Sequence, residues 1–89
     1  MKVTKERLDK FFDTVEEWNP RYFALVFSLP NHEEYELIVN PRANLTEKRN
    51  YIEKNYDKNC VLLANLDVKI VGFVMGDSLA EIEEKMGEI

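Results

Sequence analysis

Two stretches of this chain, Arg21–Leu29 and Val68–Met75, are apolar on both of their alternating sets of positions. Neighbouring side chains of a β-strand point to opposite faces of the sheet, so a strand of this kind has no face suited to water. Such strands normally lie in the middle of a sheet that is covered on both sides. The chain must therefore cover both faces of its sheet with its own helices, or leave one face for another molecule.

Three other segments predict those helices. Thr4 is a suitable N-cap for a helix over Lys5–Trp18, in which apolar residues recur at helical spacing before Asn19-Pro20 ends it. Asn44 and Glu47 have the spacing of a capping box, with Asn44 as the N-cap of a helix from Leu45 to Tyr56. Ser78 and Glu81 predict a short last helix that ends near Gly87.

Two further strands are predicted from less pronounced sequence patterns. In Glu34–Asn40, Tyr35, Leu37 and Val39 alternate with Glu34, Glu36 and Asn40, which predicts one apolar face and one wet face. Pro41 ends this strand because it cannot donate to a sheet ladder. The turn residues Pro30–Glu33 indicate that it forms a hairpin with Arg21–Leu29. The short apolar run Cys60–Ala64 predicts a fourth strand, and Gly72 inside Val68–Met75 indicates a bulge or a close approach of another group.

These elements predict a single α+β domain over residues 1–89, in the order α-β-β-α-β-β-α. Its sheet has four largely antiparallel strands with helices packed on it. The two strands that are apolar on both faces should lie in the middle, with Glu34–Asn40 and Cys60–Ala64 at the edges.

Composition and charge exclude several functions. The chain of 89 residues has a net charge of -5, and this acidic balance disfavours direct binding of nucleic acid. It has no apolar run long enough to cross a membrane and no signal-peptide pattern, so we expect a cytoplasmic protein that does not bind membranes.

No catalytic or cofactor site is predicted. The single histidine, His32, falls in a turn and cannot build a histidine metal site alone. The single cysteine, Cys60, lies in an apolar run that would raise its pKa rather than activate it. The three glycines form no phosphate-binding loop. We therefore expect a protein without enzymatic activity, metal or cofactor.

Arg42 is a candidate anion-binding residue. It follows Pro41 in a short loop before the helix that Asn44 is predicted to cap. Backbone N–H groups at a helix N-terminus can meet a guanidinium at such a position and bind a phosphate or a carboxylate. The alternative is that Arg42 bonds only to carbonyl or carboxylate groups of its own turn.

Two surfaces are candidates for binding a partner protein. If all helices pack on one face of the sheet, the other face, with Tyr22, Ala24 and Val26, stays exposed and implies a partner or self-association. Acidic residues on the first and last helices, Glu81 and Glu84 among them, could imitate the phosphates of a nucleic acid, although an ordinary solvated face is the simpler reading. That acidic set comprises Asp9, Asp13, Glu16, Glu17, Glu81, Glu83, Glu84 and Glu88.

The segment Glu36-Leu37-Ile38-Val39-Asn40-Pro41-Arg42-Ala43-Asn44, followed by a helix rich in lysine and tyrosine and then by Val68-Lys69-Ile70-Val71-Gly72-Phe73, resembles small uncharacterised proteins encoded by phages and prophages of Gram-positive bacteria. The resemblance covers about residues 34–76 and implies a bacterial cytoplasm during infection or lysogeny. It implies no site residues.

Three functions remain open at this point. The first is a phage or prophage accessory protein that acts by binding another protein, such as a host or defence protein. The second is a nucleotide- or phosphate-binding domain that uses Arg42 and the helix N-terminus at Asn44. The third is a structural protein that associates with itself through the second face of its sheet, for example as a homodimer.

Overall fold

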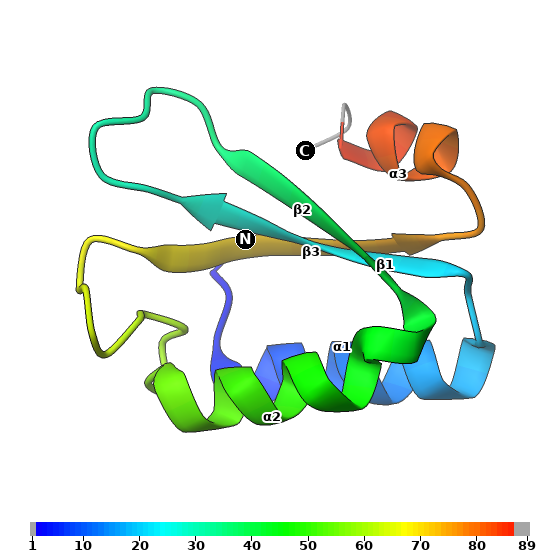
Figure 1. Ribbon diagram of the computed structural model, residues 1–89, viewed down its shortest axis with the longest axis horizontal. Helices are drawn as coiled ribbons and strands as arrows, with labels where there is room; N and C mark the ends of the chain where they lie inside the picture. The colour runs from blue at the N-terminus through cyan, green and yellow to red at the C-terminus, as the bar shows by residue number, and fades with distance from the viewer. Residues whose placement is uncertain (1, 87–89) are drawn as a thin grey trace.

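The computed structural model describes residues 2–86, which form three α-helices and a three-stranded antiparallel sheet. The elements follow the order α1 (Lys5–Trp18), β1 (Tyr22–Ser28), β2 (Glu36–Pro41), the 3₁₀ turn η1 (Arg42–Asn44), α2 (Leu45–Asn55), β3 (Lys69–Gly76) and α3 (Leu79–Met86). The strands lie in the order β2-β1-β3, with β1 in the middle (Figure 1). The prediction of an α+β domain is confirmed, whereas the fourth strand is wrong.

The predicted fourth strand, Cys60–Ala64, is instead a series of turns that makes only isolated bridges, Tyr56 to Leu62 and Val61 to Lys69. The Asp57 carboxylate accepts hydrogen bonds from the backbone N–H groups of Asn59 and Val61 at 2.8 and 3.0 Å, and Cys60 adopts a left-handed φ of 59°. A side chain that binds the backbone in this way competes with an extended strand. The edge prediction is therefore correct for β2, but β3 forms the second edge rather than a central strand.

The first helix has the bounds that the sequence predicts. The Thr4 hydroxyl accepts a hydrogen bond from the backbone N–H of Arg7 at 3.2 Å, and Asn19 ends the helix in the left-handed conformation. Asn44 is the N-cap of α2 and the helix begins at Leu45, as predicted, but the Asn44 side chain makes no capping hydrogen bond and η1 leads directly into the helix. At α3, the Ser78 hydroxyl accepts from the N–H of Glu81, as the capping box predicts, whereas the predicted end at Gly87 lies outside the described residues.

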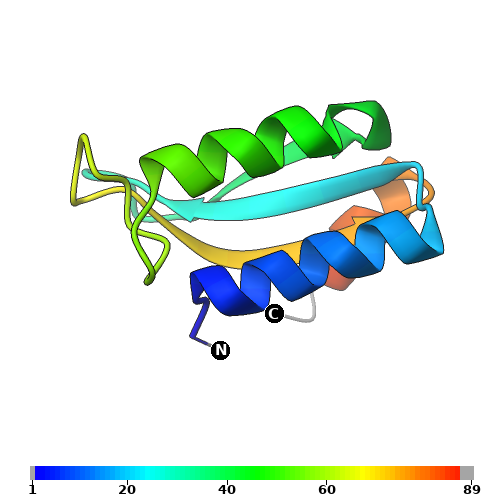
Figure 2. The ribbon, with the colours of Figure 1, turned by 90° about the horizontal axis from the view of Figure 1, so that it is seen from below.

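The helices divide between the two faces of the sheet (Figure 2). α1 and α2 lie together on one face, and α3 lies on the other. The larger core lies under α1 and α2, where Phe12 packs edge-to-face on Phe23 and Phe11 stacks on Phe73. A smaller core joins Ala24, which is fully buried, to α3. Both faces of β1 are thus covered within the chain.

A bulge in β3 changes which of its side chains share a face. Val26 pairs with Gly72 and Phe27 with Ile70, so Val71 is left without a partner on β1. Ile70 therefore joins Phe73 in the larger core, although strict alternation predicts opposite faces for them. A Cβ on Gly72 would lie 3.3 Å from the side chain of Val26, so both readings of this glycine, a bulge and a close approach, are confirmed.

Candidate functional site

A groove separates the edge strand β2 from α2, on the side of the molecule that faces the viewer in Figure 1. It consists of two adjoining hollows of about 280 and 300 Å³ that share Lys48 and Tyr51 in their linings. We call it the β2–α2 groove. The polar hollow is lined by Asn40, Asn44, Glu47, Lys48 and Tyr51. The apolar hollow is lined by Phe27, Leu29, Glu36, Ile38, Lys48, Tyr51, Ile52, Tyr56 and Val68.

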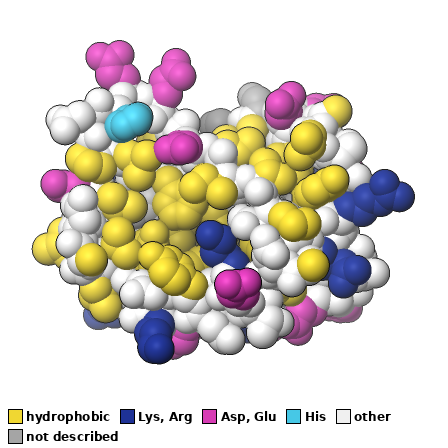
Figure 3. Space-filling model, viewed as in Figure 1, with side chains coloured by type: hydrophobic (Ala, Val, Ile, Leu, Met, Phe, Trp, Pro, Cys, Tyr) yellow, Lys and Arg dark blue, Asp and Glu magenta, His cyan; other side chains and the backbone are white. Residues whose placement is uncertain are grey.

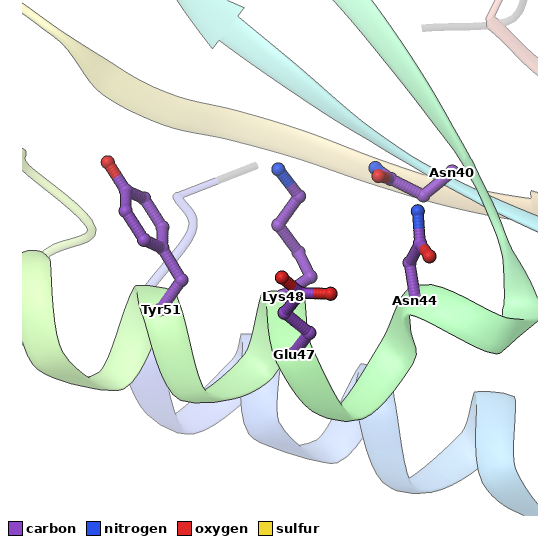
Figure 4. A pocket seen from close by; sticks show the side chains of 5 residues that line it. All are labelled: Asn40, Asn44, Glu47, Lys48 and Tyr51. Carbon is purple, nitrogen blue, oxygen red and sulfur yellow. The ribbon is translucent and has the colours of Figure 1, made fainter.

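The polar hollow lies where β2 turns into η1 and α2, so the groove is closed at this end (Figure 4). Asn40 is 7% exposed, and its amide nitrogen has no hydrogen-bond partner among the described residues. The side chains of Asn40 and Lys48 both point into the space between β2 and α2. A buried amide donor normally finds a partner, because leaving it unpaired costs about 1–3 kcal/mol. Such a donor in a hollow indicates a place for a hydrogen-bond acceptor from another molecule.

Lys48 supplies the positive charge of this hollow. Its side chain is partly buried, and its ammonium nitrogen lies 6.0 Å from the centre of the Tyr51 ring. None of the ion pairs among residues 2–86 involves Lys48. The ammonium is therefore placed beside the unpaired amide of Asn40 without a carboxylate partner of its own.

The apolar hollow leaves large side chains open to solvent. Ile38 is 38% exposed and Tyr51 52% exposed, at the two sides of the groove, whereas Ile52 and Tyr56 form its buried floor. Figure 3 shows hydrophobic side chains gathered over this part of the surface. Apolar side chains that line a hollow and remain exposed are typical of an interaction site.

The outer edge of β2 runs along the groove without a partner strand among the described residues. The backbone N–H of Arg42 bonds to the carbonyl of Arg21 on the β1 side at 2.9 Å. Because backbone groups of successive residues alternate between the two edges of a strand, those of Leu37 and Val39 point to the open edge. This edge carries hydrogen-bonding groups for one more strand.

The predicted anion site is not assembled as expected. Arg42 lines a different hollow, of about 700 Å³, together with Arg21 and Asp77, whereas Asn44 lines the β2–α2 groove. The two predicted residues thus face different hollows.

The residues of the predicted interaction surface lie around α3. Ala24 and Val26 are at most 2% exposed and Tyr22 is partly buried, so they do not form the exposed surface predicted for the case in which all helices pack on one face. α3 covers Ala24, which packs with Ile82 of that helix. Glu81 accepts a hydrogen bond from the backbone N–H of Asp77 and pairs with Lys85, and the first of these contacts lowers the pKa of its carboxyl. Glu84 is exposed.

The acidic residues of α1 are largely engaged within the chain. Arg49 of α2 lies within 4 Å of carboxylates on three successive turns of α1, with the shortest distance 2.8 Å. These carboxylates belong to Asp9, Asp13 and Glu16. They join α1 to α2, which weakens the interpretation of this surface as an imitation of nucleic-acid phosphates. Glu88, the last residue of that acidic set, lies outside the described residues.

Cys60 is fully buried, and burial raises the pKa of its thiol to about 11. Its thiol is therefore protonated at neutral pH, as its apolar surroundings in the sequence predict. The described residues contain no group of three or more histidine, cysteine, aspartate or glutamate side chains placed to hold a metal ion. In the same part of the chain, no helix combines the length and the apolar character needed to cross a bilayer.

Sequence reasoning missed the residues at the centre of the groove, Asn40, Lys48 and Tyr51. The alternation in β2 predicts a wet face for Asn40, but α2 crosses beneath that face and buries it. One signal was present in the sequence: Asn40 directly follows three apolar residues within a strand that must pack on a helix.

No protein-family model, curated protein or solved structure matches this chain. The resemblance to phage and prophage proteins stays a prediction, and the groove is interpreted from its own chemistry.

Proposed function

We propose that this protein is a non-enzymatic binding domain that takes an extended segment of a partner protein into the β2–α2 groove. The segment adds a strand to the open edge of β2 and places alternate side chains against the apolar hollow. The observation that carries the proposal is the unpaired edge of β2, at Leu37 and Val39, beside the exposed Ile38 and Tyr51.

This mode of binding combines two sources of affinity. Backbone hydrogen bonds along the edge align the segment whatever its sequence, and the pockets for alternate side chains select its residues. Folded proteins usually block such edges with lysine, proline or a bulge. β2 contains only one of these devices, Pro41, which is its last residue, so the edge from Glu36 to Asn40 is left open. An edge left open beside apolar side chains is therefore better explained by binding than by chance.

The setting that the sequence suggests fits this activity. A small accessory protein of a phage or prophage could bind a host or defence protein through one exposed segment, without needing a reaction centre. The nucleotide-binding alternative has weaker support, because Arg42 and Asn44 line separate hollows. Self-association through the second sheet face also has weaker support, because α3 packs on that face and Ala24 and Val26 are buried.

A substitution that blocks the edge tests the proposal. Val39→Pro removes the backbone N–H that points to the open edge, and an edge strand tolerates proline better than a central strand does. Val39→Ala is the control, because it also removes the branched valine side chain but keeps the N–H. Peptides selected from a random display library should bind the native protein and the alanine variant but lose at least about tenfold in affinity for the proline variant.

NMR spectra of the labelled protein give the second measurement. Bound peptide should shift the amide signals of Leu37 and Val39 more than those of β3. A library that yields no binding peptide, or peptides that bind Val39→Pro as tightly as the native protein, would contradict the proposal.

A further inference from the structure

We infer that the polar hollow recognises the C-terminal carboxylate of the bound segment, through the Asn40 amide and the Lys48 ammonium. This inference rests on the proposed binding of an extended segment in the β2–α2 groove and specifies which kind of segment it takes. The partner chemistry is an apolar peptide end with a free carboxylate.

The polar hollow contains two hydrogen-bond donors but no acceptor that pairs with them among the described residues. Asn40 presents a buried N–H donor without a partner in residues 2–86, and Lys48 presents an ammonium without an ion pair in the same range. Both point into the space that Asn44 and Tyr51 also line. Donors that converge in this way require an acceptor, and charge-assisted hydrogen bonds to a carboxylate are the strong form of that contact.

The charge of the hollow and its place in the groove favour a carboxylate over a phosphate. Lys48 contributes one positive charge, and the exposed Glu47 at the rim contributes one negative charge. This balance suits a monoanion held by one ammonium and neutral amides better than a phosphate dianion. The hollow of about 280 Å³ adjoins the apolar hollow, so a chain end can enter it while the preceding residues lie along the groove. A chain end fits it better than a nucleotide.

The polar hollow lies at the end of the groove where β2 joins η1 and α2. β2 continues through η1 into α2, so a segment lying along β2 meets the chain at Pro41–Asn44 and cannot continue in the same direction (Figure 1). A chain that ends there avoids this obstacle, and the donors at that point suit a carboxylate rather than an N-terminal ammonium. The segment then runs in the same direction as β2, with its preceding residues over Ile38 and Phe27.

The test uses three random octapeptide libraries on the native protein. One has free C-terminal carboxylates, the second has terminal carboxamides, and the third has terminal carboxamides with an aspartate fixed in the middle. The strongest binders should come from the first library, and converting their carboxylate to a carboxamide should weaken binding by about 10- to 100-fold, the value of a charged hydrogen bond.

Lys48→Gln assigns the effect to this hollow. It should reduce the affinity for carboxylate peptides to the level of their carboxamides and leave the affinity for the carboxamides unchanged. Lys54→Gln, an exposed lysine on the same helix, is the matched control and should change neither. A loss that is equal for both peptide forms would indicate a general packing defect and would contradict the inference.

The outcomes separate the inference from the proposed function. Equal binding of both peptide forms, still sensitive to Val39→Pro, would overturn carboxylate recognition and leave strand addition intact. Binding by the third library that depends on Lys48 would overturn the C-terminal assignment in favour of an internal acidic residue. If no library binds, both the inference and the proposed function fail.

Discussion

The two outer strands of the sheet, β2 and β3, differ in how far their free edges are protected from pairing with another strand. Beside β3, the segment that follows α2 folds back, and the N–H of Ile70 donates to the carbonyl of Cys60 at 2.9 Å. β3 also contains the bulge at Val71 and begins with the exposed Lys69. Beside β2, by contrast, there is a groove with exposed Ile38 and Tyr51. The β3 edge carries several of the devices by which proteins prevent further pairing, whereas the β2 edge carries only Pro41 at its last position.

The packing beneath the two edges follows the same division. On the β3 side of the helix-covered face, Phe11 stacks on Phe73 with ring centres 4.5 Å apart, and Cys60 is fully buried. On the β2 side, the amide nitrogen of the buried Asn40 has no hydrogen-bond partner within residues 2–86. The tightly packed core and the groove to which we assign binding therefore lie in different halves of this small domain, so substitutions in the two halves should act differently.

The largest expected effect is a loss of stability from a substitution in the well-packed half. Phe12 is 1% exposed and lies edge-to-face on Phe23, so Phe12→Ala should lower the free energy of unfolding by about 3–5 kcal/mol. The equivalent truncation in the groove, Tyr51→Ala, should cost less than about 1 kcal/mol, because this side chain is 52% exposed. Urea unfolding of both variants measures the difference. Similar costs would show that the groove is packed as tightly as the core.

The next-largest effect concerns Cys60, beside the β3 edge, and appears as a change in the free energy of unfolding with pH. Burial raises the pKa of the Cys60 thiol from 9.0 to about 11, so the folded protein keeps this proton at pH values where the unfolded chain has lost it. Its contribution to stability is therefore complete below pH 9 and is lost as the pH rises towards 11, by up to about 1.4 kcal/mol per pH unit.

Cys60→Ala provides the control for this effect, since the pKa of Tyr56 is also raised by burial and titrates in the same direction. The native protein should lose more stability than the alanine variant between pH 8.5 and 10.5 in urea unfolding. Parallel pH profiles, or rapid alkylation of the folded protein by iodoacetamide at pH 8, would mean that this edge opens to solvent.

Local signals explain what the sequence predicted well. The bounds of α1 depend on Thr4 and on Asn19-Pro20, which act on their own neighbours. The central place of β1 follows from its apolar residues on both faces. Where a nearby side chain competed with a strand, the prediction was wrong: the Asp57 carboxylate binds the backbone of the following residues and prevents Cys60–Ala64 from becoming a strand.

The candidate site could not be predicted from such local signals. The burial of Asn40 depends on where α2 crosses beneath β2, and the place of Lys48 opposite it depends on the path of η1. The alternative of an exposed surface at Ala24 and Val26 does not hold, and at Ala24 the cause is again the packing of a helix, α3. In both cases the packing of a helix on a distant strand decided which residues are accessible.

The smallest expected effect is an increase in stability, and it concerns Asn40 in the polar hollow beside β2. Asn40→Leu keeps nearly the same side-chain size but removes the unpaired amide, so it should raise the free energy of unfolding by about 0.5–1.5 kcal/mol. The same substitution should abolish the preference for peptides with a free carboxylate, because it removes one of the two proposed donors. Unfolding curves and peptide affinities measured on one preparation would show the gain and the loss together. A stability decrease of more than about 1 kcal/mol would instead mean that the Asn40 amide serves the fold, and a preserved carboxylate preference would exclude it from the site.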